Sequence, residues 1–334
     1  MRLDDDENPA EAFIDQAWEA PTPAKQAAYA RRALAVDPDA IDAYVALALS
    51  VETLAEQIAL LREGMRIGTQ LWAAEIKRPS KAHFWSSLDT RPYMRAVHNL
   101  ALALWQRGER AEAAELADLL VRLNPNDNQG ARYLGLAWHP VLGNWPRVER
   151  LLSQYAGECR TEYLYACCLN TFRLGGDADA VLAEALDTNP HVPGQLLTRR
   201  RPKGTESPWG VALGSVEEAA AYAENNLEAW GTVPGALVWL IEAMMARELM
   251  LYTEHGVSPS ATLMALLCGD MMGAMALGGE AIRSHLGDIA AWTYLMSSLG
   301  SFALAIAPPG PQVRGSLLPG HRADRHLSHV EREC

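Results

Sequence analysis

The sequence predicts an all-α fold built from antiparallel helix pairs. Alanine and leucine dominate its 334 residues, whereas the runs of Val, Ile, Thr and aromatic residues that favour strands are scarce. A stretch of 34 residues, 94–127, has the length and residue pattern of a repeating helix–turn–helix unit. Hydrophobic residues make up 49% of the chain, which is enough to bury a sizeable core between such helices.

The unit 94–127 reads MRAVHNLALALWQRGERAEAAELADLLVRLNPND. It matches the tetratricopeptide pattern, apart from the aromatic positions, at Leu100, Ala101, Leu104, Ala113, Ala117 and Pro125. Gly108 is expected to end the first helix, and Pro125 the second. We therefore predict a tetratricopeptide-type right-handed superhelical solenoid.

The same spacing predicts one repeat domain over residues 10–250, with about six helix pairs. An aromatic-rich insert at 71–90 is expected to pack on an edge of the array; the alternative is that it forms part of a binding wall. A long Pro- and Gly-rich loop is predicted at 193–214. Ser215 and Glu218 have the spacing of a capping box that opens the next helix.

Four segments of the sequence resemble the suppressor of tumorigenicity 7 protein family and its shorter bacterial relatives. They are FWSSLDTRPYMRA (84–96), NPNDNQGARYL (124–134), NPHVPGQLL (189–197) and EEAAAYAENNLEAWGTVPGAL (217–237). The similar region covers about residues 25–245. The resemblance implies a helical-repeat protein without an established enzyme activity. The eukaryotic relatives carry membrane spans before the repeat region, and we find none here.

Charge and composition exclude several classes of protein. A net charge of −12 argues against nucleic-acid binding, which requires a basic surface. The first residues, 1–9, are acidic, are expected to be disordered and lack the apolar core of a signal peptide, so we expect a cytoplasmic protein. The Ala- and Arg-rich, lysine-poor composition indicates a bacterial source. No short catalytic, nucleotide-binding or metalloprotease motif is found, so we predict neither an enzyme nor a cofactor.

The C-terminal part of the chain allows two interpretations. Residues 251–307 form an apolar, helical segment in which 289–307 holds 19 consecutive uncharged residues, long enough for a membrane span. We expect instead a helical cap on the array, because Ser, Thr and Gly are frequent there. Residues 308–334 are predicted to be disordered, and the His321, His326, His329 and Cys334 cluster in this tail has no structural metal-site spacing.

Candidate binding residues follow from the repeat register. The first helix of each pair is expected to line a concave groove that binds an extended peptide or a partner helix. The side chains predicted to face this groove include Arg95, His98, Asn99, Arg132 and Tyr133, a set able to grip a carboxylate. A second candidate is the basic loop, which contains Arg199, Arg200, Arg201 and Lys203 and could bind an acidic partner.

These observations predict a protein–protein interaction scaffold or adaptor. Two alternatives remain at this point. One is a membrane-anchored assembly factor attached through 289–307, and the other is an enzyme with an unrecognised site in the C-terminal segment near His255, Asp270 or His285. Neither the partner protein nor the biological process follows from the sequence.

Overall fold

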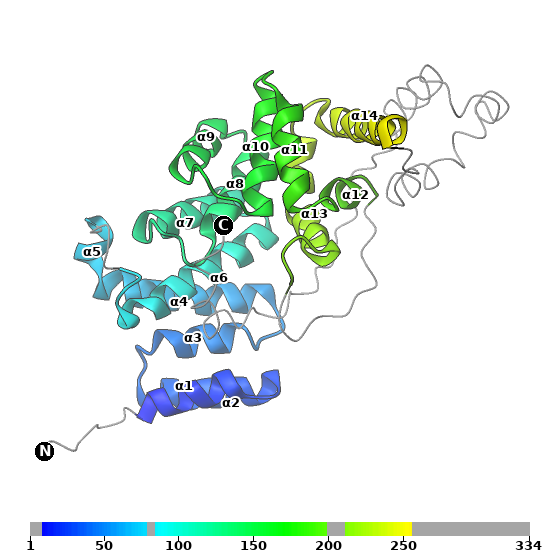
Figure 1. Cartoon of the computed structure of the whole chain (residues 1–334). Helices are drawn as coiled ribbons and strands as arrows, with labels where there is room; N and C mark the ends of the chain where they lie inside the picture. The colour runs from blue at the N-terminus through cyan, green and yellow to red at the C-terminus, as the bar shows by residue number, and fades with distance from the viewer. Residues whose placement is uncertain (1–8, 79–83, 199–210, 256–334) are drawn as a thin grey trace, which may run out of the picture. The chain divides into compact units, whose positions relative to one another are not determined.

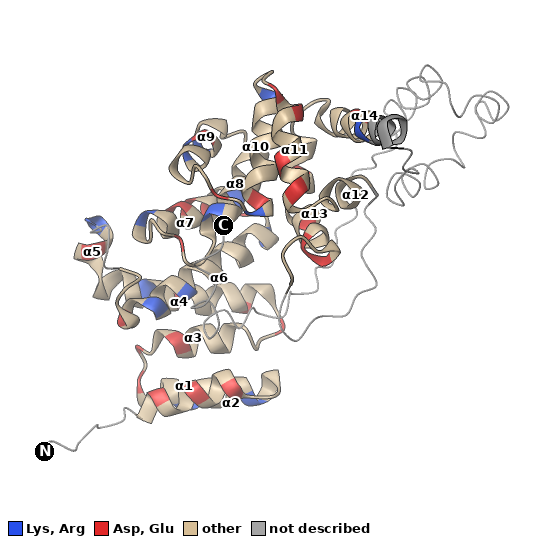
Figure 2. Ribbon diagram, in the orientation of Figure 1, with Lys and Arg blue, Asp and Glu red and all other residues tan. Residues whose placement is uncertain are grey.

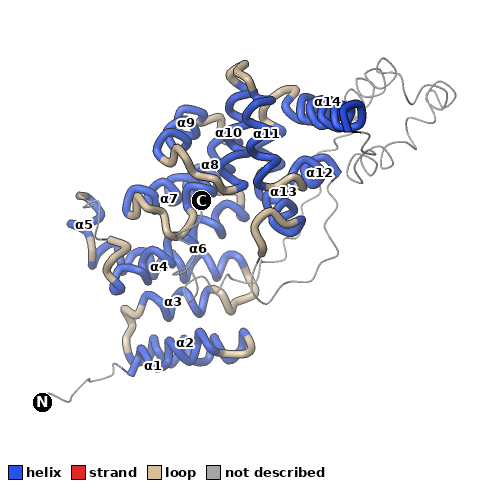
Figure 3. The backbone as a smooth tube through the Cα atoms, in the orientation of Figure 1, coloured by secondary structure: helices blue, strands red, loops and turns tan. Residues whose placement is uncertain are grey.

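A computed structural model describes residues 9–78, 84–198 and 211–255 (Figure 1). Every regular element within these residues is a helix, and no strand occurs among them (Figure 3). The fold class of the described chain is therefore all-α. None of these helices combines the length and the apolar character that crossing a bilayer requires. The predictions for 1–8, the basic loop, the segment 289–307 and the tail lie outside the described residues.

The chain divides into two compact units, Met1–Arg147 and Val148–Cys334. In unit 1, successive helices pack as neighbours: α1 with α2, α3 with α4, and α6 with α7. Helices α4 and α6 also pack on each other, and α7 packs on α8. The bounds are α1 Pro9–Glu19, α2 Pro23–Val36, α3 Ile41–Ala48, α4 Leu54–Leu71, α5 Ala73–Lys77, the 3-10 turn η1 Leu88–Thr90, α6 Arg91–Arg107, α7 Arg110–Leu123, α8 Ala131–Val141 and α9 Trp145–Gln154, which crosses the boundary between the units.

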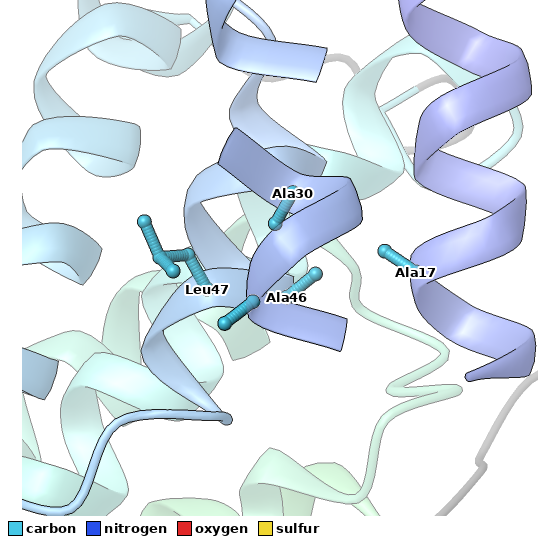
Figure 4. Packing of buried hydrophobic residues seen from close by; sticks show 5 residues of the cluster. Ala17, Ala30, Ala46 and Leu47 are labelled. Carbon is cyan, nitrogen blue, oxygen red and sulfur yellow. The ribbon is translucent and has the colours of Figure 1, made fainter. Parts of the chain in front are cut away.

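Alanine allows the helices of unit 1 to approach closely. Ala17 of α1, Ala30 of α2 and Ala46 of α3 are almost fully buried in one cluster, together with Ala27 and Leu47 (Figure 4). A methyl side chain loses no rotamer freedom when it is buried and holds the neighbouring backbone at short range. The alanine-rich composition is thus used for packing between helices.

Local signals in the sequence set the ends of these helices. Thr22 and Thr53 accept hydrogen bonds from backbone N–H groups in the first turns of α2 and α4. Gly108 follows α6 with φ of 94°, a left-handed conformation that costs glycine little, so the predicted helix end is confirmed. Helix α7 ends at Leu123, two residues before Pro125.

The predicted insert brings three aromatic rings together next to α6. Phe84 is buried, and its ring lies edge-on to Trp72 and to Tyr93 of α6 at centroid distances of 6.3 and 5.9 Å. Tyr93 is also buried and lies against Gly68 of α4. These contacts favour the packing interpretation of the insert for the part that the structure describes.

Unit 2 contains the remaining helices. Helix α10 packs on α11, α12 packs on α13 and α14, and α10 contacts both α13 and α14. The bounds are α10 Thr161–Arg173, α11 Ala178–Thr188, α12 Val192–Thr198, α13 Val216–Gly231 and α14 Ala236–His255.

Helix α12 differs from the sequence prediction, which placed a loop at 193–214. Residues up to Thr198 are helical instead. Pro193 stands in the first turn of this helix, where its missing N–H group breaks no helical hydrogen bond. Val192 and Leu196 are buried, so burial of apolar side chains outweighs the Pro- and Gly-rich composition here.

Candidate functional site

The predicted groove residues all lie in unit 1, on α6 and at the start of α8. Arg95 is already engaged by a carboxylate of its own unit. Its Nε donates to Oδ1 of Asp42 at 2.9 Å, and its Nη2 donates to Oδ2 of the same residue, so the pair is bidentate. Asp42 lies in the first turn of α3, and only 9% of its surface is exposed. The pair therefore joins α3 to α6 across 53 residues of sequence.

The two other candidates on α6 lie beside Arg95. Asn99 uses its side-chain amide to donate to the backbone carbonyl of Arg95 at 2.8 Å, one turn earlier. His98 is half-buried on the same helix. Leu102, one turn after His98 on α6, is 40% exposed. Helix α6 thus carries three partly buried polar side chains, Arg95, His98 and Asn99, followed by the exposed apolar side chain of Leu102.

Arg132 and Tyr133 at the start of α8 form a second ion-pair site. The Asp127 carboxylate accepts hydrogen bonds from the backbone N–H groups of Ala131 and Arg132, at 2.8 and 2.7 Å, which caps the helix. Its Oδ2 also lies 3.1 Å from Nη1 of Arg132. The Arg132 guanidinium stands 4.2 Å from the centroid of the Tyr133 ring and donates to its hydroxyl.

The electrostatics of this second site are dominated by burial. Asp127 is 3% exposed, and its backbone adopts a left-handed conformation with φ of 51°. Burial raises the pKa of Asp127 above its ordinary value, although the hydrogen bonds and charge of Arg132 act in the opposite direction. The hydrogen bonds of the Asp127 carboxylate nevertheless connect it to the first turn of α8 and to the Arg132 guanidinium.

The structure therefore pairs each predicted clamp arginine with a different internal carboxylate, Asp42 or Asp127. Sequence reasoning selected the two arginines and missed both acids. For Asp42 a signal was present, because Asp42 occupies the same position of its predicted repeat unit that Arg95 occupies in the next predicted unit. Neighbouring first helices bring such equivalent positions together. For Asp127 the signal was its place just before α8, where a capping carboxylate is common.

A third polar cluster in unit 1 was not predicted. One oxygen of Asp118 on α7 lies 3.1 Å from Nε2 of His139 and 2.8 Å from Nε of Arg147. Burial alone would raise the pKa of Asp118, but the hydrogen bonds from His139 and Arg147 lower it below the ordinary value. His139 is 3% exposed and lies inside α8, so its contact with Asp118 ties α7 to α8.

Unit 2 holds one buried carboxylate in a dense hydrogen-bond network. Oε2 of Glu218 accepts hydrogen bonds from the Thr161 hydroxyl, the Asn189 amide and the Gly214 N–H, at 3.0, 2.8 and 2.8 Å. The Ser215 hydroxyl accepts from the Glu218 N–H, which confirms the forward half of the predicted capping box. The reverse half of the box is not formed: the Glu218 carboxylate accepts from the Gly214 N–H, and the Ser215 N–H donates to the Ala212 carbonyl at 3.3 Å.

The described helices carry both Lys or Arg and Asp or Glu residues (Figure 2). Two arginines with exposed side chains on α4 form ion pairs: Arg62 pairs with Glu109 and Glu112, and Arg66 pairs with Glu63. Within the described residues, no group of three His, Cys, Asp or Glu side chains has the geometry to hold a metal ion. Cys167 and Cys168 are free thiols on α10, and burial raises the pKa of each.

No protein-family model matches the sequence, and no curated protein is significantly similar to it.

Proposed function

We propose that this chain is a protein–protein interaction scaffold or adaptor that binds a peptide or a partner helix on the first helices of tetratricopeptide-type pairs. The observation that carries the proposal is the contact between α3 and α6. Asp42 and Arg95 stand at equivalent positions of successive predicted units and meet in a bidentate pair. Such a contact between equivalent positions is expected where first helices stack side by side and line one surface.

The side chains around this contact are suited to peptide recognition. Arg95, Asn99 and Tyr133 are only partly buried, and they present guanidinium, amide and aromatic groups. Leu102 adds an exposed apolar side chain on α6. Tyrosine and arginine are among the side chains that contribute most to protein interfaces.

An enzyme is not proposed. Two carboxylates with shifted pKa values have structural contacts instead: Asp127 caps α8, and Asp118 ties α7 to α8. We also propose a cytoplasmic location, with which the net charge of −12 is compatible. Attachment through 289–307 remains outside the described residues.

A peptide selection with two matched variants tests the proposed function. A random peptide library is panned against the full chain, and an enriched peptide is titrated by fluorescence anisotropy. Leu102→Asp on α6 should weaken binding by about tenfold or more, because a carboxylate then occupies the proposed surface. Leu71→Asp, at a 61% exposed position at the end of α4, is the control and should change the affinity less than about twofold.

Two results would contradict the proposal. The first is the failure of repeated selections to enrich any peptide. The second is an equal loss of affinity in Leu102→Asp and Leu71→Asp, which would place the peptide elsewhere or indicate a nonspecific charge effect. Circular dichroism of both variants confirms that they retain the helical fold.

A further inference from the structure

The Asp42 carboxylate has the position that a bound carboxylate would take on Arg95. It meets the Nε and Nη2 edge of the guanidinium with both oxygens. This edge-on bidentate geometry is the preferred way in which arginine recognises a carboxylate. Arg95 is therefore occupied by an internal copy of the group that a clamp at this position would bind.

Two features strengthen this occupation. Asp42 lies in the first turn of α3, where the helix dipole stabilises a negative charge. The pair is also largely shielded from water, since the side chains of Arg95 and Asp42 are 26% and 12% exposed. A ligand carboxylate would have to displace a tethered one, which has a far higher effective concentration than a free peptide.

The internal pair also cancels the charge that would attract an acidic ligand. Arg132, the second predicted clamp residue, is neutralised in the same way by Asp127. With the net charge of −12, long-range attraction for acidic peptides is absent from this surface. Both short-range and long-range electrostatics disfavour a carboxylate ligand.

We propose that Asp42 determines the specificity of the predicted groove by occupying Arg95. The groove then excludes acidic peptides and binds a peptide segment that presents uncharged polar groups to the Arg95–Asp42 pair. This inference rests on the proposed function and replaces the carboxylate ligand that the arginines alone suggested. An uncharged amide or hydroxyl can contact the paired side chains without breaking their ion pair. A carboxylate of the ligand, in contrast, has to compete with Asp42 for Arg95 and meets a surface without net positive charge.

The test uses two labelled probes of equal length, an oligoglutamate and an oligoglutamine peptide. Each is titrated by anisotropy into the wild-type chain, Asp42→Asn and Asp42→Ser. Wild type should not prefer oligoglutamate, whereas both variants should gain oligoglutamate affinity by about tenfold or more, because Arg95 is released. Adding Arg95→Gln to Asp42→Asn should abolish the gain.

Glu63→Gln is the matched control, since it removes the same charge from the exposed Glu63–Arg66 pair of α4 in the same unit. It should leave both affinities unchanged. An equal gain in Glu63→Gln would overturn the proposal, because the effect would then come from net charge alone. A preference of the wild-type chain for oligoglutamate that Arg95→Gln removes would also overturn the proposal. This comparison does not depend on the folding of either Asp42 variant.

The outcome is independent of the peptide selection. If no library peptide is enriched but the Asp42 variants gain the oligoglutamate affinity, Asp42 masks Arg95 and the scaffold proposal alone is wrong. If a peptide binds through Leu102 and the Asp42 variants gain nothing while circular dichroism shows them folded, the groove proposal holds and the masking proposal is wrong.

Discussion

The two units of the chain use polar side chains in different ways. In unit 1, ion pairs such as Arg95–Asp42 join the side chains of successive helices at partly exposed positions, over a core of alanine and leucine. In unit 2, the polar contacts converge on the buried Glu218 carboxylate, which connects the start of α10, the residue after α11 and the start of α13. The Asp42 and Asp127 carboxylates of unit 1 each pair with an arginine, whereas the Glu218 carboxylate of unit 2 is held by uncharged donors at an irregular connection.

This difference indicates where each unit tolerates change. The Arg95–Asp42 pair is only partly shielded from water, so a substitution there changes the charge that the surface presents to a ligand. A buried carboxylate with three donors is strongly destabilising once a donor is removed, because the charge is left without compensation. We therefore expect a binding phenotype from substitutions at Asp42 and a folding phenotype from those around Glu218.

The largest effect is expected at Asn189. Its amide donates to Glu218 and to the Ser215 carbonyl, and its Oδ1 accepts from the His191 N–H. Asn189→Ala should cost about 3 kcal/mol or more, since it removes all three bonds and leaves the carboxylate short of a donor. Hydrogen exchange of the full chain, resolved by peptide, should show lost protection in α10 to α13.

Asn170→Ala serves as the control for that change. Asn170 lies on α10 and accepts a hydrogen bond from Arg173 at a partly exposed position. Its removal should cost less than about 1 kcal/mol. Equal losses in the two variants would contradict a special role for the buried network.

A packing change in unit 1 should have the next largest effect. A Cβ at Gly68 of α4 would lie 2.3 Å from the ring of Tyr93, which is 1% exposed. Gly68→Ala should therefore destabilise unit 1 by about 2 kcal/mol or more, despite the better helix propensity of alanine. The urea unfolding midpoint and hydrogen exchange in α4 and α6 measure this loss.

Gly64→Ala, one turn earlier on the same helix, is the matched control. A Cβ there meets its neighbours at 3.4 to 3.5 Å, which is ordinary contact. This variant should be neutral or more stable by up to about 1 kcal/mol. If both alanine variants behave alike, the close approach of α4 and Tyr93 is not as described.

Asp118 should make unit 1 sensitive to acid. Because the pKa of Asp118 is lowered in the folded chain, its contribution to stability is present at neutral pH and is lost as the pH falls below the value in the unfolded chain. Asp118→Asn should lower the free energy of unfolding at neutral pH and should make that free energy fall less steeply as the pH is lowered. Glu115→Gln, at an exposed position of α7, removes the same charge as a control and should change the free energy of unfolding at neutral pH by less than about 0.5 kcal/mol.

Glu162 of unit 2 should show a smaller effect of opposite sign. Burial, with a contribution from the charge of Glu218, raises the pKa of Glu162, so the folded chain favours its protonated form. Its contribution to stability is then present in acid and is lost as the pH rises through the folded value. Glu162→Gln should stabilise the chain at neutral pH but not in acid, while the exposed Glu184→Gln should change the free energy of unfolding at neither pH.

The helices of unit 1 could be predicted because their signals are local. Small residues at fixed spacing, Gly108 and the capping threonines act within a few residues of the chain. Helix α12 was missed because its stability comes from the burial of Val192 and Leu196, whereas the composition around it indicates a loop. Local propensity is a weak predictor where tertiary packing decides.

The candidate site was predictable only in its residues and not in their partners. The repeat register selected Arg95 and Arg132 as polar residues of the first helices. The positions of Asp42 and Asp127 were compatible with such pairs, but the pairs themselves depend on side-chain rotamers and, for Asp42, on how closely α3 and α6 approach. The arginines alone suggested a carboxylate ligand, and the pairs argue for an uncharged one.

Site-specific photo-crosslinking tests the proposed binding surface most directly. A benzophenone amino acid replaces Leu102 on α6 or Leu71 on α4, and each chain is irradiated with the library-selected peptide. Our account predicts a crosslinked product at position 102 and none at position 71. A product at position 71 alone, or at neither position while the peptide still binds, would contradict it.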